Sequence, residues 1–152
     1  MRSRTKTGLL ICGLLLLIIQ FIRPEPNKGS PAEHSMYSAP ANVRALLKKS
    51  CFDCHSNNSN YPWYSNIQPA GWWLSSHIEN GKSELNFNEL SKYSLRRQKS
   101  KLRAIAESIE DGSMPLPSYL WIHRTANLSE PEKQILITWA DSARNSLSNI
   151  SP

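Results

Sequence analysis

The stretch Ser50-Cys51-Phe52-Asp53-Cys54-His55 contains two cysteines three positions apart, with a histidine directly after the second. This C-x-x-C-H spacing is typical of c-type haem attachment. Each thiol can add across one of the two haem vinyl groups to form a thioether, and the adjacent histidine then lies beneath the iron as an axial ligand. We therefore expect one covalent haem held by Cys51 and Cys54, with His55 bound to the iron.

Three other uses of a C-x-x-C pair compete with this interpretation. A thioredoxin-like redox site needs a βαβ context, which the sequence lacks. A zinc site would need His55 together with His77 or His123 in an unusual arrangement, since no second cysteine pair exists. A structural disulfide would suit an oxidising compartment. The haem interpretation is favoured because it uses the histidine as well as both cysteines.

The sixth iron position is assigned to Met114, which lies 59 residues after His55 and directly before Pro115. A residue before proline is held in an extended conformation, which can present the thioether to the iron. His77 is the main alternative ligand and His123 a weaker one. Paired His/Met ligation would raise the reduction potential and fill both axial positions.

The residues after the N-terminal region predict an all-α domain, because apolar side chains recur at helical spacing and no alternating strand is found. Stop signals are expected at Gly81 and Gly112, and Ser129-x-x-Glu132 forms a capping box. We expect long loops over residues 52–68 and 112–128 that wrap the cofactor. The expected helices run over residues 38–51, 69–80, 94–110 and onward from 129, with Leu102, Ile105, Ala106, Ile109, Leu136, Trp139, Ala140 and Ala143 on their apolar faces.

The N-terminal residues 8–22 form an uncharged run, GLLICGLLLLIIQFI, preceded by Arg2, Arg4 and Lys6. Spanning helices need about 17–25 residues, so the run is short, yet no small-residue cleavage site follows it. We expect residues 1–22 to be an uncleaved, single-pass signal anchor. The positive-inside rule then puts the remainder on the periplasmic side of the cytoplasmic membrane.

The next segment, residues 23–40, contains four prolines and no periodicity, which predicts an extended tether before a domain over residues 41–152.

Without the three N-terminal cations the chain carries 15 basic and 12 acidic residues, and this excess of positive charge is too weak to indicate nucleic-acid binding. The basic run 96–101 predicts a solvated helix face, with docking of an acidic redox partner as the alternative. Cys12, inside the apolar run, is expected to be a buried, inert thiol.

An aromatic cluster follows the motif, and its indole N–H and phenol O–H groups could bind the buried haem propionates. We expect one or two of its members in that role and packing roles for the others. Pro62 or Pro69 could supply the carbonyl that orients the proximal histidine. The cluster consists of Tyr61, Trp63, Tyr64, Trp72 and Trp73.

The chain resembles a cytochrome c, and more narrowly the small haem-binding-domain family of Bacteroidetes-type bacteria. The resemblance covers residues 41–143, and its stretches are SCFDCHSNNSNYPWYSNIQPAGWWLSSHIENGKSELNF, DGSMP, SYLW and LSEPEKQILITWA. It implies a helical fold whose first and last helices pack together, with haem on Cys51 and Cys54. It also implies His55 as proximal ligand and, by analogy with mono-haem cytochromes c, Met114 as distal ligand.

The expected function is single-electron transfer between membrane or periplasmic redox partners, without catalysis, since no hydrolytic grouping is found. One alternative is a haem sensor or peroxidase-like module with a labile sixth ligand. Another is a haem relay docked on a larger oxidase or peroxidase.

Overall fold

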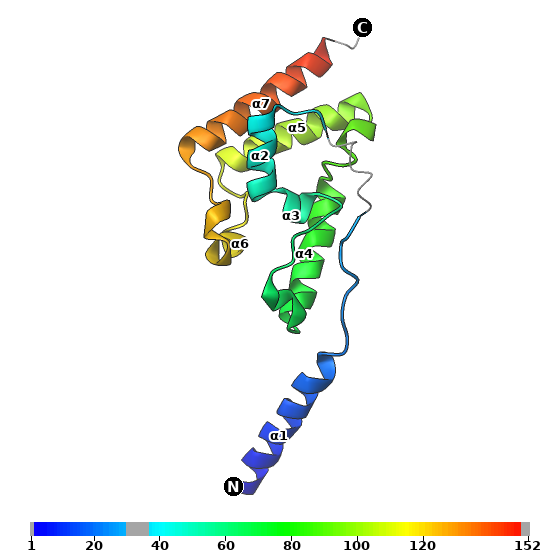
Figure 1. Cartoon of the computed structure of the whole chain (residues 1–152), viewed down its shortest axis with the longest axis vertical. Coiled ribbons are helices and arrows are strands. Elements are labelled where there is room, and N and C mark those ends of the chain that lie inside the picture. Colours follow the sequence, from blue (N-terminus) through cyan, green and yellow to red (C-terminus); the bar gives the residue numbers. More distant parts are fainter. Residues whose placement is uncertain (1, 30–36, 150–152) are drawn as a thin grey trace.

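The computed structural model describes residues 2–29 and 37–149, and every regular element in these two ranges is a helix (Figure 1). This confirms the all-α prediction. A single isolated antiparallel bridge, between Lys28 and Asn58, is the one β-type pairing in the described part. The elements are α1 Arg2–Ile19, α2 Ala41–Ser50, α3 Phe52–His55, η1 Trp63–Asn66, α4 Ala70–Glu84, η2 Leu90–Lys92, α5 Leu95–Glu110, α6 Pro117–Ile122, η3 Arg124–Ala126 and α7 Glu130–Ser148.

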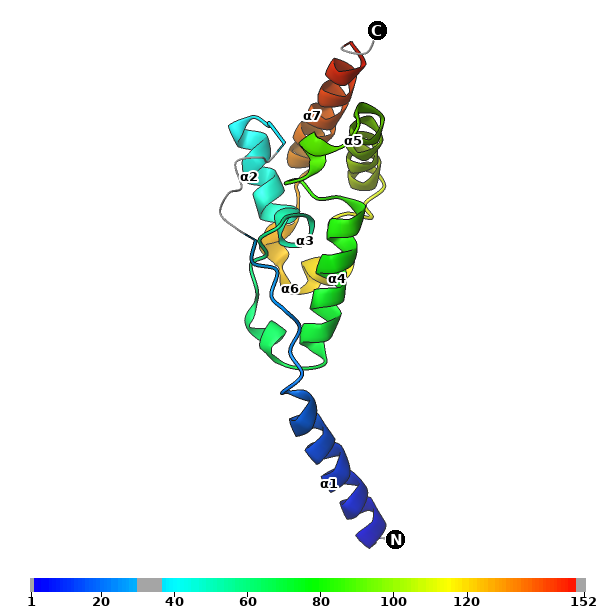
Figure 2. The same cartoon turned by 90° about the vertical axis from the view of Figure 1, so that its right-hand side faces the viewer.

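The hydrophobic core lies where α5 and α7 run side by side and α2 crosses them (Figures 1 and 2). Helix α2 contacts α7, as the resemblance implied for the first and last helices of the domain, but α7 packs far more extensively on α5. Burying such side chains stabilises the fold by about 1.5–3 kcal/mol each. The core residues are Val43, Leu47, Phe87, Leu90, Leu102, Ile105, Ala106, Ile109, Leu128, Leu136, Trp139 and Ala140.

The predicted limits of α5 are confirmed by its capping groups. The Ser94 hydroxyl accepts a hydrogen bond from the Arg97 backbone N–H at 3.4 Å, and the helix ends at Glu110. Gly112 follows with φ of +74°, a left-handed conformation that costs a glycine little. The chain therefore reverses directly after α5.

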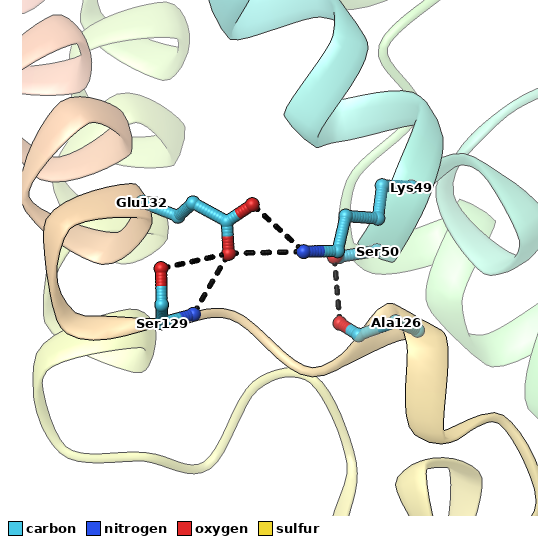
Figure 3. A network of polar contacts seen from close by, with 5 residues as sticks. All are labelled: Lys49, Ser50, Ala126, Ser129 and Glu132. Atoms are coloured by element: carbon cyan, nitrogen blue, oxygen red, sulfur yellow. Dashed lines mark hydrogen bonds and ion pairs between the residues drawn. The ribbon is translucent and has the colours of Figure 1, made fainter.

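Helix α7 begins at the predicted capping box, in which the Glu132 carboxylate accepts bonds from both the N–H and the hydroxyl of Ser129. The same carboxylate pairs with Lys49 of α2 at 2.8 Å (Figure 3). At the next residue of α2, the buried Ser50 hydroxyl donates a hydrogen bond to the Ala126 carbonyl at 2.7 Å. These bonds fix the end of α2, where the cysteine motif starts, onto the segment that leads into α7.

The predicted helix stop at Gly81 is wrong, because α4 continues to Glu84. A Cβ at Gly81 would lie 2.8 Å from the Cys54 carbonyl oxygen and 3.2 Å from the Cys54 Cβ. Only a glycine leaves room for the motif turn to pack directly on the backbone of α4 at this position. Gly81 itself has an ordinary helical backbone conformation.

The two predicted loops contain short helices that the sequence pattern does not predict. Residues 52–68 include α3 and η1, and residues 112–128 include α6 and η3. None of the four exceeds six residues, so they are too short to show an apolar periodicity. Pro117 at the first position of α6 is the one local start signal among them.

The expected signal anchor over residues 1–22 forms a helix, α1, over Arg2–Ile19. No helix among the described residues has both the length and the apolar character needed to cross a bilayer. The three basic residues that precede the uncharged run, Arg2, Arg4 and Lys6, fall inside α1 and shorten its uncharged part.

The first part of the predicted tether is extended but is bound to the domain. Asn27 is its central residue: its side chain donates to the Ser56 carbonyl and the Ser59 hydroxyl and accepts from Lys82 Nζ at 2.6 Å. The Asn27 backbone N–H donates to the Tyr61 hydroxyl at 2.6 Å. We call residues 20–29 the strap. Residues 30–36, which complete most of the tether, lie outside the described part.

Candidate functional site

The cysteine motif forms one tight turn between α2 and α4. The Cys51 N–H caps α2 by donating to the Leu47 carbonyl at 2.8 Å, and the His55 N–H donates to the Cys51 carbonyl at 2.9 Å. Cys51, Cys54 and His55 are thereby held on the single turn of α3 and its cap. All three residues border one cavity at the junction of α2, α4 and α6.

Both cysteines are free, half-buried thiols. Burial raises the pKa of Cys51 to about 12, and the neighbouring Cys54 adds to this effect. Burial, with a contribution from Asp53, raises the pKa of Cys54 to about 11. The two groups are therefore protonated at neutral pH. Within residues 2–29 and 37–149 no three His, Cys, Asp or Glu side chains gather as a metal-binding cluster.

His55 is oriented by a backbone carbonyl. Its Nδ1 lies 3.0 Å from the carbonyl oxygen of Leu85, directly after α4. Because a carbonyl only accepts hydrogen bonds, Nδ1 carries the proton and Nε2 keeps its lone pair. Burial lowers the pKa of His55, which favours this neutral imidazole. The prediction that Pro62 or Pro69 supplies this carbonyl is wrong. The Pro62 and Pro69 carbonyls accept hydrogen bonds from the backbone N–H groups of Ser65 and Trp73.

Two adjoining cavities of about 190 and about 220 Å³ lie beside the motif. Both are bordered by Ser50, Cys51, His55, Glu84, Met114 and Pro115. The second extends along α5, where Phe87, Ile105 and Ile109 form an apolar wall. The space is suited to a flat apolar group that contacts the motif and Met114 together.

Met114 reaches this space because the chain reverses at Gly112. Its backbone N–H donates to the Ser108 carbonyl at 2.9 Å, which holds the segment against the end of α5. Met114 lines both cavities, whereas His77 lines only the first. The His77 ring lies 4.1 Å from the Trp73 ring, and its Nδ1 is 2.9 Å from the Trp73 carbonyl. Both candidate sixth ligands therefore border the cavity that contains His55.

The chain matches a known protein family over most of its length. Residues 14–142 match the model of a haem-binding domain, which covers most of the chain. The chain belongs to the haem-binding domain family. The matched range begins inside α1, so it includes the strap as well as the cysteine motif. No curated protein and no solved structure matches the chain.

The residues of this haem-binding domain fit the cofactor. The site offers two unpaired thiols, a histidine with an available Nε2 and a thioether, all bordering the same apolar space. Thioether and imidazole are established axial donors to haem iron, and thiols can bind the macrocycle covalently.

Three of the five predicted aromatic residues border none of the cavities beside the motif. The Trp72 indole N–H donates to the Ile22 carbonyl of the strap at 2.7 Å. Trp63 is 76 % exposed and contacts Tyr64 edge-on. Tyr61, a third member, receives the Asn27 backbone bond.

The other two aromatic residues of the haem-binding domain, Tyr64 and Trp73, border a small space of about 20 Å³ beside Cys54. The Tyr64 hydroxyl lies 2.9 Å from Nε2 of His123, which ties η1 to the end of α6. The Trp73 ring packs on His77. Tyr64 and Trp73 therefore line the edge of the site beside Cys54.

Tyr119 and Asp53 belong to the site although sequence reasoning gave them no role. The Tyr119 hydroxyl donates to the Asp53 carboxylate at 2.8 Å, and its ring stacks on His123 at 4.4 Å. Burial, together with the bond to Asp53, raises the pKa of Tyr119. A tyrosine in a six-residue helix carries no periodic signal, but its stretch SYLW was among those that showed the resemblance.

Lys101 is the second residue that the sequence did not identify. Among the described residues it is the one lysine or arginine at these cavities: it borders the second cavity only, and it pairs with Glu84 at 3.4 Å. The basic run 96–101, which contains it, predicted a solvated helix face or a docking patch for an acidic redox partner. Two carboxylate groups of a haem would need such a cation nearby.

Proposed function

We propose that this protein is a mono-haem c-type cytochrome that transfers single electrons. In this proposal Cys51 and Cys54 hold the haem through thioethers, His55 is the proximal ligand and Met114 the distal ligand. The observation that carries it is that all four residues border one pair of adjoining apolar cavities.

The protein's own residues prepare the site. The Leu85 carbonyl fixes the His55 ring so that Nε2 is the free nitrogen, and packing of α4 at Gly81 holds the motif turn in place. Phe87, Ile105 and Ile109 exclude water on one side. A bound haem would supply a one-electron iron couple. Methionine ligation would favour its ferrous form and thus raise the potential.

We further propose that the haem domain works on the periplasmic side of the cytoplasmic membrane with redox proteins as its donor and acceptor. Support comes from the basic residues that precede the apolar run 8–22, which resemble an export signal. Attachment of c-type haem outside the cytoplasm agrees with that location.

The test is the visible spectrum of the full chain, exported together with haem-maturation machinery. We expect haem that stays bound on a denaturing gel, a low-spin spectrum, and the weak far-red band of methionine-ligated ferric iron. Replacing both motif cysteines by alanine should leave no covalent haem. Absence of covalent haem in the unmodified protein would refute the proposal.

Matched variants decide the distal ligand. Met114→Ala should remove the far-red band and lower the potential, while Met36→Ala should leave both unchanged. If His77→Ala alone abolishes the low-spin spectrum, His77 is the ligand instead. If the unmodified ferrous protein takes up carbon monoxide, the sensor or peroxidase-like function is favoured over a simple carrier.

A further inference from the structure

The end of the domain nearest α1 exposes a group of large apolar side chains. Phe21 is 87 % exposed, Ile22 59 %, Trp63 76 % and Ile67 49 %. We call these four residues the base patch. Single exposed apolar residues are common, but a contiguous group marks a surface that meets something apolar.

Hydrogen bonds bring the two halves of the base patch together. The Gln20 side chain accepts from the Gln68 N–H at 2.8 Å and donates to the Gln68 carbonyl at 3.0 Å. The Trp72 indole donates to the Ile22 carbonyl at 2.7 Å. Gln20 and Ile22 flank Phe21, while Gln68 follows Ile67 at the end of η1. Both views show the strap meeting this lower end of α4, with α1 projecting away from it (Figures 1 and 2).

The apolar surface continues from the base patch along α1. Residues of every helical face are exposed there, including Leu9 at 73 %, Leu10 at 74 % and Leu17 at 66 %. A helix that is apolar all round is found in a protein core or in lipid. A protein partner would cover one face of such a helix, whereas lipid chains surround all faces.

We propose that the base patch rests on a lipid surface that is continuous with the one around α1. Trp63 would lie among the headgroups, because an indole places its apolar rings in lipid and its N–H in water. Lys6 and Arg23 bound the exposed apolar run, and such cations extend toward anionic headgroups. This inference rests on the proposed membrane location and adds that the domain is docked there in one orientation.

Docking also fixes how far the haem attachment site lies from the lipid. Helix α4 runs from Ala70 at the base patch to Gly81 against Cys54. Eleven residues at 1.5 Å per residue give a separation of roughly 16 Å along the helix. The orientation would therefore keep the motif above the headgroups.

The test uses the full haem-loaded chain with vesicles of phosphatidylcholine and phosphatidylglycerol. Flotation shows whether the chain binds lipid, and hydroxyl-radical oxidation read by peptide mass spectrometry shows which tryptophans lipid covers. Trp121 is the internal control because it is 85 % exposed and belongs to α6, outside the base patch. We expect Trp63 oxidation to fall several-fold in vesicles while Trp121 oxidation stays constant.

The outcomes separate the two proposals. Flotation with equal oxidation of Trp63 and Trp121 would overturn docking and leave the membrane location standing. A chain that does not float would overturn both. Protection of Trp63 without lipid, or only after a protein fraction is added, would overturn the lipid assignment and indicate a protein contact. Trp63→Asp should restore base-patch oxidation at Ile67 and Phe21, whereas Trp121→Asp should not.

Discussion

Gly81 tests the idea that α4 supports the cysteine motif by direct backbone contact. In Gly81→Ala the new methyl group would lie 2.8 Å from the Cys54 carbonyl oxygen, so the motif turn must shift by several tenths of an ångström. Alanine is favoured over glycine inside a helix by about 1 kcal/mol. Overpacking against a rigid neighbour costs about 2 kcal/mol. The expected net loss is about 1 kcal/mol in the free energy of unfolding.

Chemical denaturation of the haem-loaded protein measures this loss. Ser76→Ala, on an exposed face of the same helix, is the control and should change the free energy of unfolding by only a few tenths of a kcal/mol. A second readout is the fraction of haem attached through both thioethers, read from the pyridine-haemochrome band, which should fall in Gly81→Ala because Cys54 is displaced. A variant that gains the full helix-propensity energy and attaches haem normally would refute the close-packing argument.

Three further predictions concern the neighbouring contacts. The bond to Lys49, aided by Ser129, lowers the pKa of Glu132 from 4.5 to about 2; this contribution to stability is therefore present above pH 4.5 and lost as the pH falls toward 2. Acid unfolding of Glu132→Gln should show a smaller drop over that range than the unmodified protein, and an equal drop would contradict the assignment. Ser50→Ala leaves the buried Ala126 carbonyl without its partner and should cost about 1–2 kcal/mol in thermal or chemical unfolding; no loss would mean that water replaces the hydroxyl. Cys54→Ala should retain haem through a single thioether to Cys51, detected as a shifted pyridine-haemochrome band, whereas complete loss of haem would show that one thiol cannot hold it.

The sequence predicts the helices that have local signals. Helices α5 and α7 are bounded by Ser94, Gly112 and the capping box at Ser129, and their apolar periodicity identifies the buried side chains. Each of these signals acts within a few residues of the helix end. Local patterns are therefore sufficient for this half of the fold.

Features that depend on distant contacts are not predicted. Gly81 looks like a helix stop until the Cys54 backbone is seen against it, and the carbonyl that orients His55 comes from Leu85, 30 residues along the chain. The Trp72 indole, one of the five aromatic candidates for binding a propionate, donates to the strap instead. The strap shows no apolar periodicity because hydrogen bonds of single residues, such as Gln20 and Asn27, hold it to the domain.

The bound strap changes how the proposed carrier would find its partners. A flexible linker as long as residues 23–40 would let its ends separate by roughly 23 Å and the haem domain search that volume. Here the Gly29 N–H donates to the Asn57 carbonyl at 2.6 Å, and the Tyr37 N–H donates to the Phe87 carbonyl at 3.2 Å. The segment is therefore hydrogen-bonded to the domain at both of these residues. The domain cannot swing between two distant proteins. In the proposed function the donor and acceptor would each diffuse to the same stationary face, so the abundance of the partners, more than the reach of a tether, would set the rate of electron delivery.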